Sequence, residues 1–441
     1  MKIIHISELG MEAARSLLST PTGVVDPGIE QTVRAILDDV RSRGIQAVIE
    51  HTQRLDSRYV DASNLRVSEA EFDAAQGEVD PGFLDAIEVA GRNIREFHEA
   101  QRTQSWFDMS HPGFVRGQII RPLARVGVCA PGASAPLAST VLMSAIPARV
   151  AGVQEVYILT PPRRDGSVNP HVLCAARASG ATGVFRCFGA QGVGAMAFGA
   201  DPVPRVDKIV GPGNAYVVTA KRLVFGHVDI ESLPGPSEIL VLSDGSGVPA
   251  FAASDLISQA EHPDGRAVLV SPSDSFVRST LVEVEKQVRE LPDGSLVRRS
   301  LKDHGCAIVT RNLDEAYELA NLFAPEHLSL LVADPMLSLP RVHNAGTVLF
   351  GNYTSKAIDD YAAGPSHVLP TGGTARFSSG LGLNDFVRRT NVVSCSREVA
   401  LQLAPTVEML ATAEGLPAHR RASSIRHETL SENETLGGML K

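Results

Sequence analysis

The chain has 441 residues, of which 44% are hydrophobic and 21% are charged, a composition typical of globular proteins that excludes disordered and fibrous chains. This length exceeds what a single hydrophobic core usually serves, so we expect two or more domains. The net charge of −9, with no local cluster of Lys and Arg to compensate, argues against nucleic acid as a partner.

Targeting and membrane signals are weak. The N-terminal apolar stretch is too short for a signal peptide, and the best membrane candidate, 141–153, is interrupted by Ser144, Pro147 and Arg149. The five cysteines are scattered without a CxxC pair, which argues against a disulfide framework. We therefore expect a cytoplasmic protein that makes no membrane contact.

The first 120 residues read as helical. Asp26 and Asp80 are each followed by proline, the pattern of a capping residue before the first helical position. Ser68 and Glu71 have the spacing of a capping box. Apolar residues then recur at helical spacing after each of these starts.

From residue 125 onward, short apolar runs alternate with helical stretches in two consecutive series. We expect strands at 125–129, 155–160, 183–188 and 208–210, then at 238–243, 267–271, 306–310, 328–332 and 347–350, with helices at 138–152, 168–179, 190–199, 214–225, 250–261, 274–290 and 314–323 between most of them. Such alternation predicts parallel sheets covered by helices on both faces. The expected fold class is α/β, with two Rossmann-like lobes of incomplete dinucleotide-binding character and helical segments at both ends.

Two glycine-rich turns follow predicted strands, at 189–194 and at 211–214. Their N–H groups are suited to hold a phosphate at the start of a helix, but glycine-rich turns after strands are also routine structural features. The segment 351–381 is longer than an ordinary connection and rich in glycine, so we expect a functional loop there. A helical piece at about 397–427 ends the chain.

Polar residues suited to chemistry come in four pairs: Gln259 with His262, Glu326 with His327, Asp360 with His367, and Glu414 with His419. The first pair shares one helix face, because its members are three residues apart. Imidazole and carboxylate ligands with a further oxygen donor suit Zn²⁺. A single histidine is more often an ordinary hydrogen-bonding residue, so this spacing alone leaves a metal site open.

A series of motifs over residues 120–420 makes the sequence more specific. They are the turn at 126–132 with Ser-Thr-Val-Leu-Met at 139–143, Gly-Pro-Gly-Asn at 211–214 with Ala-Lys-Arg at 220–222, Gly-Pro-Ser-Glu at 235–238, Ser-Gln-Ala-Glu-His at 258–262, Ala-Pro-Glu-His-Leu at 324–328, Asp-Tyr-Ala-Ala-Gly-Pro at 360–365 running into 367–373, and Glu-Gly-Leu at 414–416 with His419. In this order they resemble the histidinol dehydrogenase family.

The resemblance implies oxidation of L-histidinol to L-histidine, the last steps of histidine biosynthesis, through L-histidinaldehyde and with two NAD⁺. It implies one zinc ion per subunit, with the ligands Gln259, His262, Asp360 and His419. Glu326 and His327 correspond to the catalytic acid–base pair. The substrate would be held by the four zinc ligands together with Ser237, His327 and Glu414.

NAD contacts are implied at Cys129, Gln191 and Asn214, and a homodimer is implied in which the C-terminal segment enters the partner's site. The corresponding regions are an N-terminal helical region (1–120), a first lobe on the NAD side (121–235), a second lobe with the zinc and acid–base residues (236–381), and a C-terminal helical dimerisation tail (382–441).

Departures from the family pattern leave alternatives. Cys129 stands where the family usually has a tyrosine, which loses an aromatic stacking surface for NAD. One alternative is therefore a related NAD-dependent dehydrogenase acting on another amino alcohol or a small sulfonated diol, and another is a non-catalytic metal-binding protein on the same scaffold. His367 fits either a substrate contact or the orientation of a zinc ligand.

Overall fold

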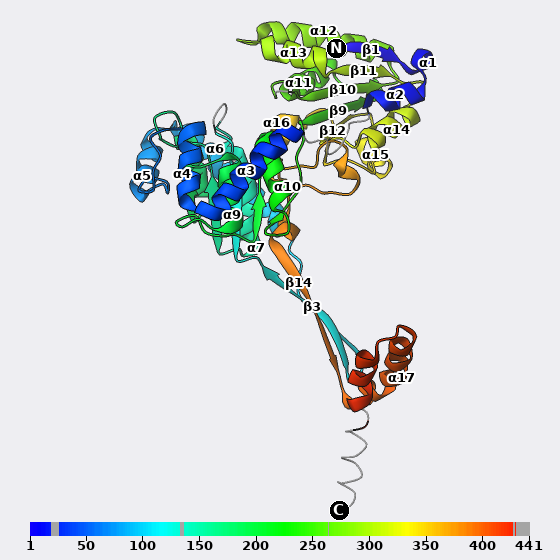
Figure 1. Cartoon of the computed structure of the whole chain (residues 1–441). Helices are drawn as coiled ribbons and strands as arrows, with labels where there is room; N and C mark the ends of the chain where they lie inside the picture. The colour runs from blue at the N-terminus through cyan, green and yellow to red at the C-terminus, as the bar shows by residue number, and fades with distance from the viewer. Residues whose placement is uncertain (19–25, 133–135, 263, 427, 429–441) are drawn as a thin grey trace, which may run out of the picture. The chain divides into compact units, whose positions relative to one another are not determined.

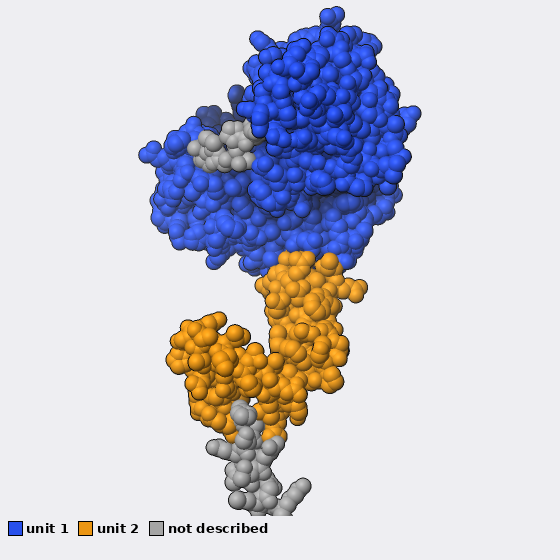
Figure 2. Space-filling view, turned by 90° about the vertical axis from the view of Figure 1, so that its right-hand side faces the viewer, with its two compact units in different colours: residues 1–102, 122–386 blue, residues 103–121, 387–441 orange. Residues whose placement is uncertain are grey.

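The computed structural model describes residues 1–18, 26–132, 136–262, 264–426 and 428. These residues form two compact units, coloured blue and orange in Figure 2. The larger unit comprises 1–102 with 122–386, and the smaller comprises 103–121 with the chain from Val387 onward. The end of the predicted C-terminal region, 429–441, lies outside the described residues.

The first sheet of the larger unit has five parallel strands in the order β6-β5-β4-β7-β8. Its strands are β4 (Arg125–Cys129), β5 (Glu155–Leu159), β6 (Gly183–Phe185), β7 (Lys208–Val210) and β8 (Asp229–Ile230). The chain starts at the central β4, builds outward to β6, and returns to the other side of β4 as β7. Between β4 and β7 the strand order reverses, and α/β sheets usually bind ligands at the carboxyl edge of such a switch point.

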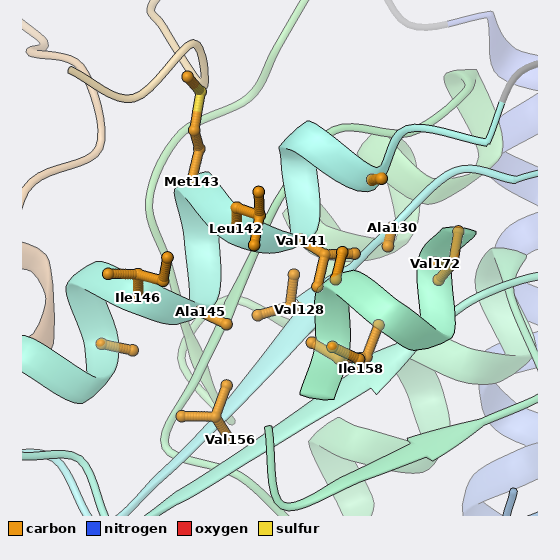
Figure 3. Close-up of a cluster of buried hydrophobic side chains, with 14 of the residues drawn as sticks. Val128, Ala130, Val141, Leu142, Met143, Ala145, Ile146, Val156, Ile158 and Val172 are labelled. Atoms are coloured by element: carbon orange, nitrogen blue, oxygen red, sulfur yellow. The ribbon is translucent and has the colours of Figure 1, made fainter. Parts of the chain in front are cut away.

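Helices cover both faces of this sheet, and together they form the first lobe. One face carries α5 (Glu69–Gly77), α6 (Pro81–Glu99), α7 (Ala138–Ala151) and α8 (Pro170–Ala178), and the other carries α3 (Pro27–Arg43), α4 (Ile45–Leu55), α9 (Gly189–Phe198) and α10 (Ala215–Val224). Figure 3 shows α7 lying over the sheet, with Val141 and Ala145 in one cluster with Val128 and Val156. Burial of such aliphatic surface, worth roughly 25 cal/mol per Å², holds the helix in place.

The second sheet has six strands in the order β1-β11-β10-β9-β12-β13, paired in parallel. Its strands are β1 (Lys2–His5), β9 (Glu238–Ser243), β10 (Arg266–Ser271), β11 (Cys306–Val309), β12 (His327–Leu331) and β13 (Thr347–Phe350). Apart from β1 at the edge, this is the strand order of the first sheet. The two sheets therefore share one topology, as the two series in the sequence predict.

The helices of this second lobe also divide between two faces. One face carries α11 (Pro249–Ala260), α12 (Asp274–Glu290) and α13 (Ser295–Asp303), and the other carries α1 (Ile6–Leu9), α2 (Met11–Leu18) and α14 (Leu313–Phe323). Two short helices, α15 (Pro335–Ser338) and α16 (Lys356–Tyr361), follow β12 and β13. The N-terminal β1, α1 and α2 thus belong to the second lobe.

The smaller unit is a three-stranded sheet with helices. It contains β2 (Trp106–His111), β3 (Phe114–Pro122), β14 (Val387–Cys395) and α17 (Arg397–Ala413), and residues 417–426 are also helical. The strand order is β14-β3-β2, and Figure 1 shows β3 beside β14. Its large apolar side chains are open to solvent: Met109 is 70% exposed, Val393 67% and Met409 72%. None of the four hydrophobic clusters of described residues includes a residue of this unit.

The α/β class, the two lobes and the helix starts are confirmed. Asp26 caps α3, and Ser68 and Glu71 form both hydrogen bonds of a capping box at α5. The helical prediction for the first 120 residues is wrong at β1 and over β2 and β3. In β2 almost every side chain is exposed, and in β3 partly buried residues occur on both faces, so neither strand has the alternation that marks a half-buried strand. Among the described residues, no helix has the length and apolar character needed to cross a bilayer.

A buried ion pair fixes the turn that follows β7. The Lys221 ammonium donates to the Gly211 carbonyl (3.0 Å) and to Glu231 Oε1 (2.7 Å), and the Gly211 N–H donates to the same carboxylate oxygen (2.8 Å). Gly211 has φ +100°, and a Cβ there would lie 2.3 Å from the Cys129 carbonyl oxygen. Only glycine fits at this position, because β4 and the turn approach each other so closely.

We predict that Lys221→Met lowers the free energy of unfolding by about 3–5 kcal/mol, because it leaves the Glu231 carboxylate buried without a cation. The matched control is Arg125→Met, which breaks an ion pair with Glu155 whose side chains are 48% and 34% exposed. We expect the control to cost less than about 1 kcal/mol. Urea unfolding followed by circular dichroism measures both, and equal losses would contradict the prediction.

Candidate active site

The candidate site is built at the amino edge of the second sheet, where β9 and β12 lie side by side. The parallel register pairs His327 with Ile239, so Glu238 and Glu326, which precede these residues, are also neighbours. The backbone N–H of Glu238 donates to Glu326 Oε2 (2.8 Å). Glu326 is 6% exposed and His327 2% exposed, so the strand pairing holds a carboxylate and an imidazole together inside the protein.

The contacts of His327 assign its two ring nitrogens. Nδ1 lies 3.3 Å from the Glu238 carbonyl oxygen, and because a carbonyl only accepts, Nδ1 carries the hydrogen. In the neutral ring Nε2 is then the basic nitrogen. It has no hydrogen-bond partner within the described part of the chain, and it lies 3.3 Å from Asp360 Oδ1 and 3.8 Å from Asp359 Oδ2.

The charges around this imidazole are strongly coupled. Burial lowers the pKa of His327, but the carboxylates of Glu326 and Asp360 outweigh that effect and raise it to about 9. Burial raises the pKa of Asp360, but His327 and Lys356 outweigh it and hold that pKa well below its usual range. Burial raises the pKa of Asp359 to about 6. Asp360 is therefore an ionised carboxylate beside the open nitrogen of His327.

Helices α11 and α16 bring further predicted site residues to this edge. Gln259 lies in the last turn of α11 and is fully buried, yet neither polar atom of its amide has a partner among the described residues. His262 follows the end of α11. Burial lowers its pKa, the charge of Lys356 lowers it further, and the charge of Asp360 opposes both effects. Asp360 lies in α16, where its other carboxylate oxygen forms an ion pair with Lys356.

These residues fit a divalent cation. A buried amide without a partner is costly, and a metal bound at Gln259 would satisfy its oxygen. Gln259, His262 and Asp360 supply the oxygen and nitrogen donors that zinc accepts. Within the described ranges, no group of three or more His, Cys, Asp and Glu side chains is arranged to hold a metal. One predicted ligand is a glutamine, and another, His419, belongs to the smaller unit.

His367 is fixed within the protein at both nitrogens. Nδ1 donates to the Asp360 carbonyl oxygen (2.9 Å), and Nε2 therefore accepts from the Thr140 hydroxyl (2.9 Å). Burial lowers the pKa of His367. Of the two roles that the sequence left open, these contacts favour orientation of the Asp360 backbone.

The remaining predicted substrate residues lie in different places. Ser237 is half-buried immediately before β9, where its carbonyl accepts from the Arg266 N–H (2.9 Å). Glu414 ends α17, His419 lies in the helical stretch 417–426, and both are exposed residues of the smaller unit. The larger unit thus brings together Glu326, His327, His262 and Asp360, with Gln259 one turn before His262, and it contains neither Glu414 nor His419.

The predicted NAD residues lie at the carboxyl edge of the first sheet. Asn214 caps α10 by accepting from the N–H groups of Tyr216 and Val217, which leaves its own exposed amide nitrogen available. Gln191 lies in the first turn of the adjacent α9. Its Nε2 donates to Asp56 Oδ2 (3.2 Å), while its buried oxygen has no partner among the described residues.

Cys129 differs from these two residues. Its side chain is 0% exposed and packs in the hydrophobic cluster beneath α9 and α10, and burial raises the pKa of its thiol to about 12. The thiol therefore presents no surface to a dinucleotide, and a side-chain contact between Cys129 and NAD finds no support.

Sequence reasoning missed the polar residues behind the site. Lys356 and Asp359 precede Asp360 on α16, by four residues and by one, and Asp255 lies one turn before Gln259 on α11. The available signal was helical spacing, since residues four apart share a helix face. Glu238, also missed, accepts at Oε2 from the Gly372 N–H (3.0 Å) and so fastens the glycine-rich loop to β9.

Comparisons with known proteins point to one family. The family model described as "Histidinol dehydrogenase" matches residues 22–427. A histidinol dehydrogenase of Heliobacterium mobile is 46% identical over 404 residues, which is 91% of this chain and 95% of that protein. One of Syntrophotalea carbinolica is 44% identical over 427 residues, with 97% and 99% covered. The crystal structure of histidinol dehydrogenase from Elizabethkingia anophelis superimposes with a TM-score of 0.92 at 33% identity, covering 98% of this chain and 99% of that one.

We predict that Glu238→Gln changes the pH dependence of stability. Burial raises the pKa of Glu238 to about 7, with Arg266 opposing the shift. The folded protein then holds this proton more tightly than the unfolded chain, so this residue's contribution to the free energy of unfolding falls as the pH rises from about 4 through 7. One pKa unit corresponds to about 1.4 kcal/mol. The free energy of unfolding of the glutamine variant, relative to wild type, should therefore rise by about 1–3 kcal/mol between pH 5 and pH 8.

Urea unfolding of both proteins at the two pH values checks this prediction. The control is Glu285→Gln, which replaces an exposed glutamate of α12. If the difference in unfolding free energy between the Glu238 variant and wild type is the same at pH 5 and pH 8, the carboxyl of Glu238 does not have a raised pKa and the prediction is wrong.

Proposed function

The chain belongs to the histidinol dehydrogenase family, and from this premise we propose that it oxidises L-histidinol to L-histidine through L-histidinaldehyde, with reduction of two NAD⁺ to two NADH. One water is consumed, and its oxygen enters the carboxylate. The observation that carries the proposal is the juxtaposition of the buried Glu326–His327 pair with Asp360, an ionised carboxylate, on one edge of a sheet. Four electrons leave the carbinol carbon as two hydrides, so two rounds of proton removal are required.

His327 is suited to the first of these proton transfers. Its Nε2 is the open nitrogen, and its Nδ1–H is anchored on the Glu238 carbonyl. In the proposed reaction the neutral form of His327, whose pKa the neighbouring carboxylates raise to about 9, takes the hydroxyl proton of histidinol at Nε2 while hydride passes to the nicotinamide. A positioned general base of this kind typically contributes a factor of about 10²–10⁴ to the rate.

Glu326 is suited to the second round. The aldehyde must add water before another hydride leaves, and a carboxylate takes a proton from that water. One carboxylate oxygen of Glu326 accepts from the Glu238 N–H, which fixes its orientation. An imidazole and a carboxylate side by side thus divide two distinct proton transfers, and the loop that Glu238 holds at Gly372 is placed to retain the aldehyde.

We assign Gln259, His262 and Asp360, with the partner subunit's His419, as ligands of one zinc ion per subunit. Zinc, when bound, supplies a Lewis acid that binds and orients the amino and imidazole nitrogens of histidinol. The unpartnered amide of Gln259 supports this assignment. Ser237, His327 and Glu414 complete the proposed contacts with the substrate.

We place NAD at the carboxyl edge of the first sheet, with Gln191 and Asn214 as contacts. Asn214 begins α10 at the switch point between β4 and β7, where such sheets usually bind nucleotides. All five cysteines are free thiols, which is consistent with a reducing cytoplasm.

The proposed homodimer exchanges the smaller unit into the partner's site. The smaller unit, a three-stranded sheet with helices, leaves large apolar side chains exposed, and apolar surface of this kind commonly marks a protein–protein interface. The buried apolar side chains of α17 are limited to Ala404 and Ala411, while Leu410 is 58% and Met409 72% exposed. A second copy of the chain would cover this apolar surface, and the exchange would bring Glu414 and His419 to the partner's site.

We predict that the purified protein forms about two NADH per L-histidinol, measured by absorbance at 340 nm, because an alcohol carbon reaches the acid by losing two hydrides. A chelator should abolish this activity and zinc should restore it. His327→Asn should lower kcat by about 10²–10⁴, whereas His343→Asn, at an exposed histidine, should not. Activity with only another amino alcohol or a small sulfonated diol would select the related dehydrogenase instead.

We predict that two inactive variants complement each other. Glu326→Gln and His419→Asn should each abolish activity, but co-expressed chains should regain about a quarter of the wild-type activity, since half the dimers are mixed and each has one intact site. Differently tagged chains allow the mixed dimer to be purified, and on its own it should have about half of the wild-type activity, because one of its two sites is intact. An inactive mixed dimer would show that His419 serves its own chain.

A further inference from the structure

Asp255 joins three elements at the base of the site. It is 4% exposed and lies on α11, one turn before Gln259. Its Oδ1 accepts from the backbone N–H of Lys356 (3.1 Å), and its Oδ2 accepts from the hydroxyl of Ser329 (3.3 Å). A buried carboxylate is costly unless it is hydrogen-bonded, so its two bonds to other elements hold those elements in a defined place.

Each of the joined elements carries a residue of the proposed reaction. Helix α11 leads to Gln259 and His262, and α16 begins at Lys356 and reaches Asp360 one turn later. Ser329 lies two residues after His327, on the same face of β12. The ligand-bearing helices and the strand that presents the base therefore meet at Asp255.

Lys356 extends this connection to Asp360. Its side chain is 3% exposed and its ammonium pairs with Asp360 Oδ2, four residues along the helix. The same residue is thus fixed through its backbone by Asp255 and holds Asp360 through its side chain. Asp360 Oδ1 remains directed toward His327 Nε2, 3.3 Å away.

We infer that Asp255 is a positioning residue for the metal site: it docks the first turn of α16 against α11 and β12 and thereby holds Asp360 beside Gln259 and His262. This inference rests on the proposed function, because it takes those three residues as zinc ligands. Asp255 acts through Lys356 and Ser329, not as a ligand or as a base.

The test is the zinc affinity of the full-length protein, measured by competition with a metallochromic chelator. Asp255→Ala should raise the Kd for zinc about 10–100-fold, the usual effect of removing a group that orients a metal ligand. Asp255→Asn keeps an oxygen for the Lys356 N–H and should stay within about threefold of wild type. Binding of NAD, measured by calorimetry, should be unchanged in both variants.

The matched control is Ser243→Ala on β9. Ser243 is fully buried; its hydroxyl donates to the Leu331 carbonyl (2.7 Å) and accepts from the Gly245 N–H (3.1 Å), so its removal costs two hydrogen bonds at the opposite edge of the same sheet. It should lower the thermal midpoint and leave zinc affinity unchanged. If Asp255→Ala does not fold, Ser329→Ala takes its place, with an expected increase of about three- to tenfold in the zinc Kd.

The outcomes separate the two proposals. A wild-type protein that binds no zinc would overturn the proposed metal and this inference with it. If the wild-type protein binds zinc but the zinc Kd of Asp255→Ala, or of its replacement Ser329→Ala, stays within threefold of the wild-type value, only this inference is overturned. A loss of zinc affinity in Asp255→Asn as large as in Asp255→Ala would also overturn it, because the effect would then depend on charge and not on position.

Discussion

The parallel pairing of β9 with β12 is the constraint on which the site depends. It sets the Glu238 peptide beside Glu326 and His327, so that a backbone N–H orients the carboxylate and a backbone carbonyl orients the imidazole. Because the anchors are main-chain groups, both reacting side chains have a defined orientation before any ligand arrives. The helices then bring Gln259, His262 and Asp360, the proposed metal ligands, around a pair that the sheet already fixes.

The division of the chain explains why the larger unit contains an incomplete set of site residues. The strand register and two helices of the second lobe supply Glu326, His327, Gln259, His262 and Asp360, while Glu414 and His419 belong to a unit with almost no core of its own among the described residues. A segment that cannot bury its apolar side chains alone needs a partner surface. Assembly and completion of the site are therefore one requirement in the proposed dimer.

Much of the fold followed from the sequence because hydrophobic periodicity and capping residues are local signals. The starts of α3, α5 and α6 and most central strands lie within two residues of expectation. Strands β2, β3 and β14 were missed because none of them alternates between a buried and an exposed face, and β1 because a four-residue edge strand carries little pattern. Motifs identified the residues proposed to react or bind, and the structure brings Glu326, His327 and Asp360 together. They did not identify Asp255 or Lys356, whose roles depend on contacts between elements far apart in the chain.

The bridge at His367 has a mechanical consequence for the larger unit. Its imidazole spans from Thr140, on the first helix after β4, to the Asp360 backbone in the second lobe. The ring is rigid and both nitrogens are engaged, so a hinge motion that separated the lobes would break at least one of these bonds, at about 1 kcal/mol. A change in the relative position of the two lobes would thus act directly on the backbone of Asp360.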